Sequence, residues 1–303
     1  MNDLSSLFGH GLGVALTTPF TADDAIDVDA LAQLVDHVVT GGVDFVVALG
    51  STGEASLLDD GEQRVVLDVV GARTAGRVRF VVGVGAPSTR AAIDRARVAA
   101  ATGADALLVA APPYVKPSPD GVVAHFRAIV DALPDLPVIA YNVPSRNGVA
   151  ISPETVRRLW ELPGVVGIKE SSGDLVQIGR IAAEMPDDRV LLAGDDALVL
   201  PTIAVGGHGA VSVAANAVPA AMRELVHAAS IGDLANARFL HRRLVPLFDA
   251  LCREANPVPI KAALQVLGLG RAAPRLPLLP ASPETTTALQ GALRTLQEVV
   301  HHA

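Results

Sequence analysis

Short apolar runs alternate with longer amphipathic stretches between residues 12 and 215, and this alternation restricts the fold more than any other feature of the chain. Eight runs have the length and the β-branched content of buried strands: 13–17, 44–49, 79–84, 105–110, 137–141, 165–169, 189–193 and 209–213. The stretches between them repeat apolar residues at helical spacing: 29–39, 59–72, 89–101, 120–132, 153–161, 174–184 and 197–205. Strand–helix units of this kind over roughly 200 residues predict an α/β fold, a closed (β/α)8 TIM barrel with parallel strands.

An open sheet that binds a dinucleotide is the alternative arrangement of the same elements. Residues 83–85 (Gly-Val-Gly) follow a predicted strand, as the first two glycines of a dinucleotide fingerprint would. The third glycine is missing, because residues 86–88 are Ala-Pro-Ser. The closed barrel is therefore preferred.

Beyond residue 217 the predicted strands stop, and only helical patterns follow: 219–230, 233–251, 257–267 and 282–300. Residues 282–284 (Ser-Pro-Glu) repeat the helix-start signature of residues 152–154. We expect two domains, a catalytic barrel over residues 1–231 and a C-terminal all-helical domain over residues 232–303.

Charge and composition argue against several classes of partner. The net charge of −8 is dispersed and contains no basic stripe, so neither nucleic acid nor an anionic membrane surface is expected to bind. No apolar run approaches the roughly 18 residues that span a bilayer. The eight histidines lack the spacing of a ligand set, so no metal site is expected.

Cys252 is the single cysteine of the chain, so no internal disulfide can form. This cysteine usage suits a reducing compartment, and a cytoplasmic location is expected. Cys252 lies in an apolar helical pattern, which predicts a small buried side chain rather than a nucleophile.

The predicted sixth strand ends in a lysine, Lys169. Because side chains alternate along a strand, Val165, Gly167 and Lys169 are expected on one face, with the amine in the barrel or at its mouth. Burial disfavours an ammonium and can lower its pKa from about 10.4 by several units, which leaves a free amine to attack a carbonyl. Only three of the 24 basic residues are lysines, and an arginine here would be inert because a guanidinium is not deprotonated. The alternative is a lysine that extends from the strand end to solvent.

Two further groups follow predicted strands, where a parallel barrel carries its chemistry. Residues 50–54 (Gly-Ser-Thr-Gly-Glu) offer hydroxyls and free backbone N–H groups to a carboxylate or an oxyanion, although an ordinary turn explains the pattern as well. Tyr141 ends the fifth strand and can move protons beside an amine; the alternative is a core tyrosine with a hydrogen-bond partner. Arg146 can bind a substrate carboxylate; the alternative is a surface arginine in a weak salt bridge.

Seven motifs, in their order and spacing, resemble the pyruvate-dependent class I aldolases, the family that includes dihydrodipicolinate synthase and N-acetylneuraminate lyase. They are residues 50–54, 112–114, 141–144, 167–170, 194–196, 206–209 and 256–261. The resemblance extends over nearly the whole chain. It implies a (β/α)8 barrel with a C-terminal helical domain, a homotetramer built as a dimer of dimers, small-molecule substrates, and no cofactor.

The resemblance also implies roles for individual residues. Lys169 would form an imine with pyruvate, and Tyr141 would transfer protons. Ser51 and Thr52 would contact the carboxylate of pyruvate and join the proton relay. Tyr114 of a neighbouring subunit would complete this relay across a tight dimer interface. The substrate-binding set would comprise Thr52, Arg146 and Val211.

Within the family, the acceptor substrate distinguishes one reaction from another. Members that use L-aspartate 4-semialdehyde typically have an arginine where Arg146 stands, and residues 256–261 favour the same reaction. Ser51 favours the lyases, because the synthases usually have threonine there. We expect condensation of pyruvate with L-aspartate 4-semialdehyde to 4-hydroxy-tetrahydrodipicolinate. The alternative is a sugar-acid aldolase such as N-acetylneuraminate lyase or 2-keto-3-deoxygluconate aldolase.

Two other classes fit the residues less well. A barrel that only binds or regulates would be expected to lose Lys169 or Tyr141, and the chain has both. A phosphate-handling isomerase would have glycine-rich loops after strands seven and eight, whereas the glycine-rich run 206–209 precedes the eighth predicted strand.

Some members of the family are inhibited by lysine, which histidine, asparagine, glutamate and tyrosine side chains bind at the dimer interface. The corresponding positions in this chain are Ser56, Asp60, Gln63, Pro87, Ala91 and Pro113. Proline and alanine offer no polar side chain to a charged amino acid, and one exposed acid contributes little. We expect the activity to be insensitive to lysine.

Overall fold

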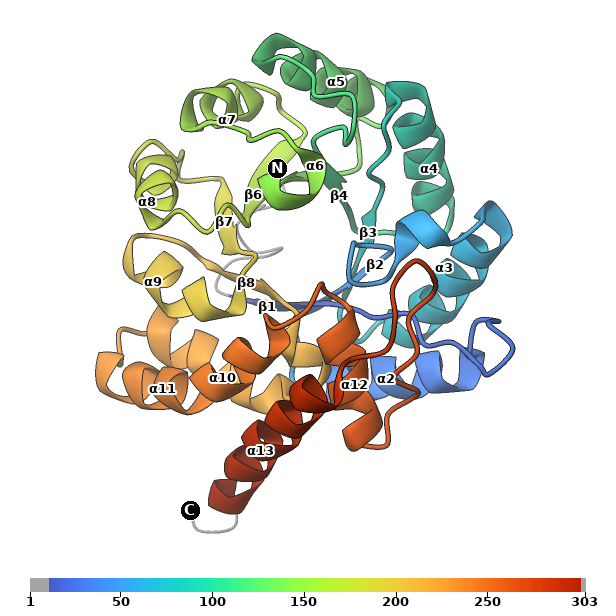
Figure 1. Cartoon of the computed structure of the whole chain (residues 1–303). Coiled ribbons are helices and arrows are strands. Elements are labelled where there is room, and N and C mark those ends of the chain that lie inside the picture. The colour runs from blue at the N-terminus through green and yellow to red at the C-terminus, as the bar shows by residue number, and fades with distance from the viewer. Residues whose placement is uncertain (1–10, 301–303) are drawn as a thin grey trace.

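The computed structural model describes residues 11–300, with side chains up to residue 296. Eight parallel strands close into a barrel in chain order, and β1 pairs with β8 (Figure 1). The strands are β1 (Leu12–Ala15), β2 (Phe45–Ala48), β3 (Arg79–Gly83), β4 (Ala106–Ala110), β5 (Val138–Asn142), β6 (Val165–Glu170), β7 (Val190–Ala193) and β8 (Gly209–Ser212). The predicted (β/α)8 barrel is confirmed, and no strand end differs from its predicted position by more than two residues.

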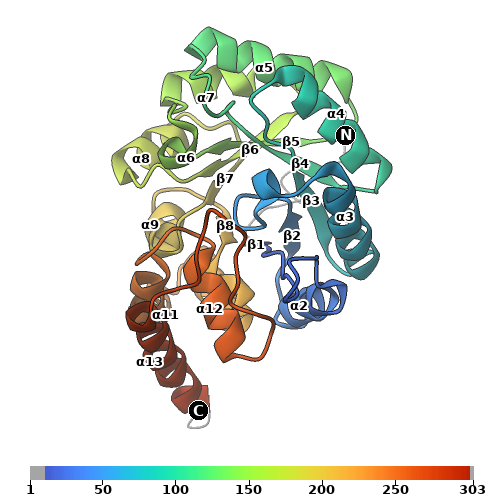
Figure 2. The same ribbon diagram turned by 45° about the vertical axis from the view of Figure 1, so that its right-hand side comes forward.

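Helices surround the barrel, as Figure 2 also shows. They are α2 (Val28–Thr40), α3 (Asp60–Thr74), α4 (Thr89–Ala101), α5 (Pro119–Ala132), α7 (Pro153–Trp160), α8 (Leu175–Ala183), α9 (Val199–Ala204) and α10 (Pro219–Ser230). The Ser-Pro-Glu signature starts α7 as predicted, because the Ser152 hydroxyl accepts from the Thr155 N–H at 3.3 Å and Pro153 is the first helical residue. A short helix, α6 (Pro144–Asn147), was not predicted, since four residues carry no helical period.

Alternate strand residues fill the interior of the barrel. Phe45 and Val47 of β2 belong to this inner cluster, whereas Val46 packs outward under the helices. Gly13 of β1 makes room for the Phe45 ring, because a Cβ at Gly13 would lie 2.1 Å from ring atom Cε2. The middle of the barrel is therefore a packed core, and substrate can enter only near a mouth.

A bulge in β6 changes which of its residues share a face. The pairing with β5 advances by two residues between Val165 and Gly167, so Val166 is an extra residue on β6. Val165 consequently packs outside the barrel, while Gly167 lies against Val190 of the inner cluster and Lys169 lies over an inner tyrosine. The prediction that Val165 shares the face of Lys169 is wrong, because side chains do not alternate across a bulge.

Three helices follow α10: α11 (Leu234–Leu251), α12 (Val258–Val266) and α13 (Pro283–Val300). The helix α11 packs on α10 and α13, and the group lies on one side of the barrel with α13 extending away from it (Figures 1 and 2). Residues 217–300 contain no strand, as predicted. Gly232, with φ of +77°, makes the turn between α10 and α11. A domain division after residue 231 stays a proposal.

Two further features are absent from residues 11–300, a membrane-spanning helix and a cluster of metal ligands. No helix in this range is long and apolar enough to cross a membrane. No three His, Cys, Asp or Glu side chains among residues 11–296 are grouped as metal ligands would be.

Candidate active site

A cavity of about 220 Å³ opens at the carboxyl ends of the strands, the end where a parallel barrel carries its chemistry. Its walls come from the ends of β5, β6, β7 and β8, from the loop after β2, and from the C-terminal helices. The lining residues include Thr52, Tyr141, Arg146, Lys169, Ser171, Asp195, Asp196, Cys252 and Asn256. Four of the residues predicted from the sequence are in this set: Thr52, Tyr141, Arg146 and Lys169.

Lys169 is the buried cation of this cavity. Only 3 % of its surface is exposed, so the alternative of a solvated strand-end lysine is wrong. Tyr141 is its direct partner across β5 and β6, and the Lys169 Nζ lies 4.3 Å from the centre of the Tyr141 ring. The amine makes no salt bridge to any carboxylate in the part of the chain that the structure describes. It is therefore not held by a charge that a substrate would have to displace.

Asp195 is a buried acid on whose pKa the charge of Lys169 acts, and no role for it was predicted from the sequence. Burial raises the pKa of Asp195, and the positive charge of Lys169 acts in the opposite direction. The neighbouring Asp196 has a different task, because it accepts from the Ser212 hydroxyl at 2.5 Å and from the Ala214 N–H at 2.8 Å. Asp196 thus fixes the turn after β8, and Asp195 is left to face the cavity.

The strand end that carries Lys169 is held by a buried hydrogen-bond network on its outer face. Glu170 accepts from the Asn142 side chain at 2.8 and 3.1 Å and from the Ser172 N–H at 2.7 Å. Burial raises the pKa of Glu170, and these hydrogen bonds oppose the rise by favouring the carboxylate. The network ties β5 to β6 immediately beside the Tyr141–Lys169 pair. The sequence motifs contained both residues, but no periodic signal indicated that they touch.

The loop after β2 places its two hydroxyls in different spaces. Thr52 is 2 % exposed and lines the Lys169 cavity, where its Oγ1 accepts from the Asn256 Nδ2 at 2.9 Å. Ser51 lines a second chamber of about 300 Å³, which shares the side chains of Tyr141 and Arg146 with the first. Tyr141 therefore stands between the lysine cavity and the chamber that Ser51 lines.

Arg146 is presented by the short helix α6. Its guanidinium is exposed and lines both spaces, and its Nη2 donates to the backbone carbonyl of Asn256 at 2.8 Å. This single contact orients the guanidinium while leaving other N–H donors for a ligand.

Besides Ser51, two predicted site residues do not line the Lys169 cavity in this chain. Tyr114 is 90 % exposed, with a positive φ of 71°, and it lines neither space. Val211 is fully buried in the barrel interior, and Val213 lines the cavity in its place.

Cys252 differs from its prediction. It is exposed rather than buried, because it follows the last residue of α11 at the rim of the cavity. Burial of the thiol, which is partial, and the nearby Asp196 and Asp195 raise its pKa, so the thiol form is favoured.

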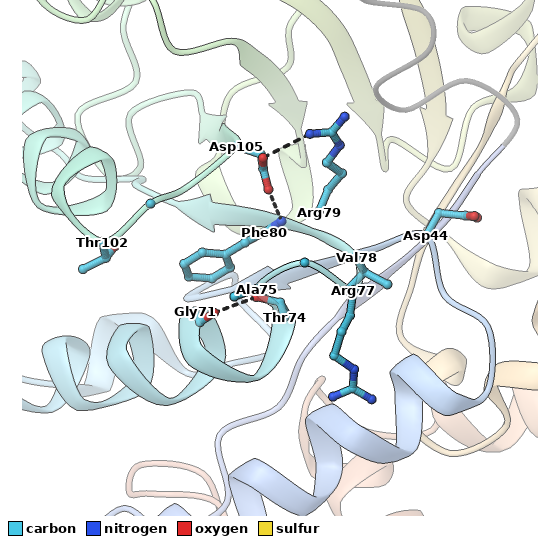
Figure 3. Close-up of a pocket in the computed structure, with 12 residues that line it drawn as sticks. Asp44, Gly71, Thr74, Ala75, Arg77, Val78, Arg79, Phe80, Thr102 and Asp105 are labelled. Atoms are coloured by element: carbon cyan, nitrogen blue, oxygen red, sulfur yellow. Dashed lines mark hydrogen bonds and ion pairs between the residues drawn. The ribbon is translucent and has the colours of Figure 1, made fainter.

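A further hollow of about 510 Å³ lies at the opposite, amino-terminal ends of β2, β3 and β4 (Figure 3). Both carboxylate oxygens of Asp105, which lines this hollow, have partners within the chain. One oxygen lies 3.3 Å from Arg79 Nη1, and the other accepts from the Phe80 N–H at 2.7 Å (Figure 3). This end of a parallel barrel generally serves stability. We therefore assign the hollow no chemistry.

A parallel barrel that buries a lysine beside a tyrosine at the carboxyl ends of its strands has the parts of an aldolase, an enzyme of the lyase class. The model of the dihydrodipicolinate synthetase family matches residues 9–296. The chain belongs to this family.

Individual relatives agree over almost the full length. The 4-hydroxy-tetrahydrodipicolinate synthase of Thermomicrobium roseum is 48 % identical and aligns with 94 % of this chain and 93 % of its own. A solved dihydrodipicolinate synthase variant described as monomeric is 34 % identical, with a TM-score of 0.93 and coverage of 97 % and 98 %. The solved enzyme of Cyanidioschyzon merolae with lysine bound is 37 % identical, with a TM-score of 0.91 and coverage of 95 % and 98 %.

Proposed function

We propose that this enzyme condenses pyruvate with L-aspartate 4-semialdehyde to give 4-hydroxy-tetrahydrodipicolinate, through an imine on Lys169. The observation that carries the proposal is the buried Lys169 amine beside Tyr141, in a cavity that Thr52 and Arg146 also line. The activity named for the relative from Thermomicrobium roseum supports this choice of reaction.

The first half of the reaction forms the imine. The Lys169 amine attacks the keto carbon of pyruvate, and the Tyr141 hydroxyl protonates the departing oxygen as water leaves. The Thr52 hydroxyl and the backbone N–H groups of Ser51 and Thr52 bind the pyruvate carboxylate. The imine withdraws electrons from the methyl group, which loses a proton and becomes the carbon nucleophile of an enamine.

The second half joins the two substrates. The enamine carbon attacks the aldehyde carbon of L-aspartate 4-semialdehyde, whose carboxylate Arg146 binds through paired N–H donors. The amino group of the joined product then attacks the imine carbon, closes the ring and releases Lys169 as the free amine.

Tyr114 enters this scheme from a second copy of the chain. The chamber lined by Ser51, Pro113 and Tyr141 has room for an aromatic side chain, and Tyr114 is almost fully exposed in its own chain. A tyrosine in this chamber would connect Ser51 and Tyr141 to solvent as a proton relay. The proposal thus requires a tight dimer. It also includes the pairing of two such dimers into a homotetramer and a location in the cytoplasm.

We also propose that lysine does not inhibit this enzyme, although lysine inhibition is expected for members of the family that bind lysine. The Gln63 amide already donates within the chain, to the carbonyls of Ala55 and Leu58 at 3.1 and 3.2 Å. Among the six corresponding positions only Asp60 carries a charge, and it lines a groove of about 320 Å³ between α3 and α4 together with Ala91. One relative has been solved with lysine bound, so insensitivity to lysine would be a property of individual members and not of the whole family.

The experiment that tests the proposed function has two parts. Borohydride reduction in the presence of pyruvate should add the mass of one pyruvate-derived group to the Lys169 peptide. Product formation should then require L-aspartate 4-semialdehyde and not N-acetylmannosamine. An adduct with turnover of the amino sugar alone would establish the sugar-acid aldolase instead, and no adduct on Lys169 would overturn both.

A further inference from the structure

Two buried charges near the active site take no part in the proposed chemistry. Lys261 of α12 is 1 % exposed, and Glu54, at the end of the loop after β2, is 2 % exposed. The Lys261 ammonium forms an ion pair with the Glu54 carboxylate. The ammonium also lies 3.9 Å from the centre of the Phe20 ring and donates to the Ala273 carbonyl at 3.3 Å.

A pair of this kind is a weak source of stability. Removing each charge from water costs several kcal/mol, and the attraction between the two charges offsets that cost only in part. Burial lowers the pKa of Lys261, and the Glu54 carboxylate acts against that change by favouring the ammonium. An apolar pair of the same volume would stabilise the chain as well or better. The ion pair therefore needs a reason other than stability.

Glu54 controls the backbone that carries Ser51 and Thr52. It has a positive φ of 55°, an uncommon conformation for a residue with a side chain. Its N–H donates back to the Ser51 carbonyl at 3.2 Å, and its second carboxylate oxygen accepts from the Arg275 N–H at 2.9 Å. With both carboxylate oxygens engaged by the C-terminal segment, the loop is fixed two residues beyond Thr52, which lines the cavity.

The same C-terminal segment reaches two of the three predicted substrate-binding side chains, Thr52 and Arg146, through Asn256. Its Nδ2 donates to Thr52 Oγ1 at 2.9 Å, and its carbonyl accepts from Arg146 Nη2 at 2.8 Å. Because Thr52 Oγ1 accepts from Asn256, the hydroxyl proton of Thr52 is left to donate into the cavity. One segment thus orients a donor for each of the two carboxylates.

We propose that Glu54 and Lys261 are positioning residues for the pyruvate carboxylate: their ion pair locks residues 50–54 to α12 and so aims the Thr52 hydroxyl into the Lys169 cavity. This inference rests on the proposed function, since it assumes that pyruvate binds at Lys169. In this proposal Thr52 contacts the substrate, whereas Glu54 and Lys261 contact only the protein and set the position of Thr52.

The test compares Lys261→Met, Glu54→Gln and the double variant by two measurements. Borohydride trapping across a pyruvate titration gives the half-saturating concentration, and thermal unfolding gives the Tm. Each single variant leaves one buried group without its partner, so the Tm should fall and half-saturation should rise by about tenfold or more, because a small misplacement of a binding group is costly. Glu54→Gln keeps an oxygen for the Arg275 N–H and carries the test if Lys261→Met does not fold.

The double variant separates positioning from stability. It has no uncompensated buried charge, so its Tm should return toward that of the wild type. The half-saturating concentration of pyruvate should remain raised, because the ion pair that joins the loop to α12 is still missing. Recovery of pyruvate affinity together with the Tm would overturn the proposal.

Arg223→Met is the matched control. Arg223 pairs with Asp44 at 2.5 Å and ties α10 to the amino-terminal end of β2, away from the cavity. Its loss should lower the Tm and leave half-saturation for pyruvate unchanged. A rise in half-saturation equal to that of Lys261→Met would show that any destabilisation weakens binding and would overturn the proposal. Failure of the wild type to trap pyruvate at Lys169 would instead overturn the proposed function.

Discussion

At the scale of single residues, the position of the Lys169 amine depends on a missing side chain. A Cβ at Gly194 would lie 2.9 Å from Lys169 Cε and 1.8 Å from Ser171 Oγ. The lysine can therefore lie in the cavity only because the start of the loop after β7 is a glycine. Neighbouring sequence does not reveal this requirement, since the contact joins two strands.

Lys169→Arg should abolish turnover and leave the fold intact, because arginine keeps the charge and similar bulk but cannot act as a nucleophile. Mass spectrometry after borohydride and pyruvate should find no adduct. Lys116→Arg is the control, since Lys116 is exposed and lines neither the cavity nor the chamber. It should keep both the adduct and the turnover. Activity above about a hundredth of the wild-type rate in Lys169→Arg would contradict an imine on Lys169.

Arg146→Ala should spare imine formation with pyruvate and raise the KM for the aldehyde acid. Losing a charge-assisted contact to a carboxylate should cost on the order of 2–4 kcal/mol in kcat/KM for that substrate. Arg146→Lys keeps a charge but not the paired donors, so it should fall between the alanine variant and the wild type. Equal losses for pyruvate and the aldehyde would instead make Arg146 a structural residue of α6.

At the scale of elements, strands and helices with a regular pattern of apolar residues could be predicted from the sequence. Local departures from that pattern could not. All predicted strands and helices are present with ends within two residues, because burial on one or both faces leaves a repeating signal. The bulge at Val166 and the short helix α6 leave no such signal, and both lie beside the site. The bulge explains how Lys169 faces inward although Val165 faces outward.

Helix α5 carries a titratable group with a testable effect on stability. His125 is buried against α4, with Nδ1 2.9 Å from Thr89 Oγ1, and burial lowers its pKa to about 4. An unfolded histidine titrates near 6.5, so its stabilising effect is complete above pH 6.5 and is lost as the pH falls toward 4. Between pH 7.5 and pH 5 this group alone should remove about 2 kcal/mol of the free energy of unfolding.

Urea unfolding at the two pH values measures this loss. His125→Asn keeps a polar partner for Thr89 and does not titrate, so its stability should change less over the same interval. The difference between the two proteins cancels the buried acids Glu170 and Asp195, whose pKa values burial raises. The same pH dependence in both proteins would show that His125 does not govern it.

At the scale of the whole molecule, the site joins segments that are far apart in the sequence. Thr52 meets Asn256, and Glu54 meets Lys261 and Arg275. Their motifs were recognisable in the sequence, but a motif does not state which other motif it touches. The contacts depend on closure of the barrel and on the packing of α12, which no local pattern describes.

Tyr114→Phe should lower kcat with little change in Tm, because only an exposed hydroxyl is removed. Wild-type activity should also fall on dilution below the dissociation constant of the dimer, since each site would lack the Tyr114 of its partner. Analytical ultracentrifugation at the assay concentrations supplies the oligomeric state. Wild-type rates in Tyr114→Phe, with activity independent of dilution, would return Tyr114 to a surface role.

Millimolar lysine should leave the initial rate at saturating pyruvate unchanged, since a charged amino acid finds too few polar partners at the six corresponding positions, where only Asp60 carries a charge. A titration of the initial rate with lysine measures this directly. Inhibition by half at or below about 1 mM, an affinity of roughly −4 kcal/mol, would show that other residues bind lysine here.

The attachment of the loop after β2 to α12 also sets the order in which a newly made chain becomes active. Synthesis begins at the amino terminus, so Lys169 and the strands around it leave the ribosome before Asn256, Lys261 and Arg275 do. Until those last three arrive, the side chains of Thr52 and Glu54 lack these partners, although the Thr18 hydroxyl can already donate to the Gly53 carbonyl. A growing chain would thus possess the proposed nucleophile before the proposed carboxylate site is complete, and it would gain the capacity to bind pyruvate only when its synthesis is nearly finished.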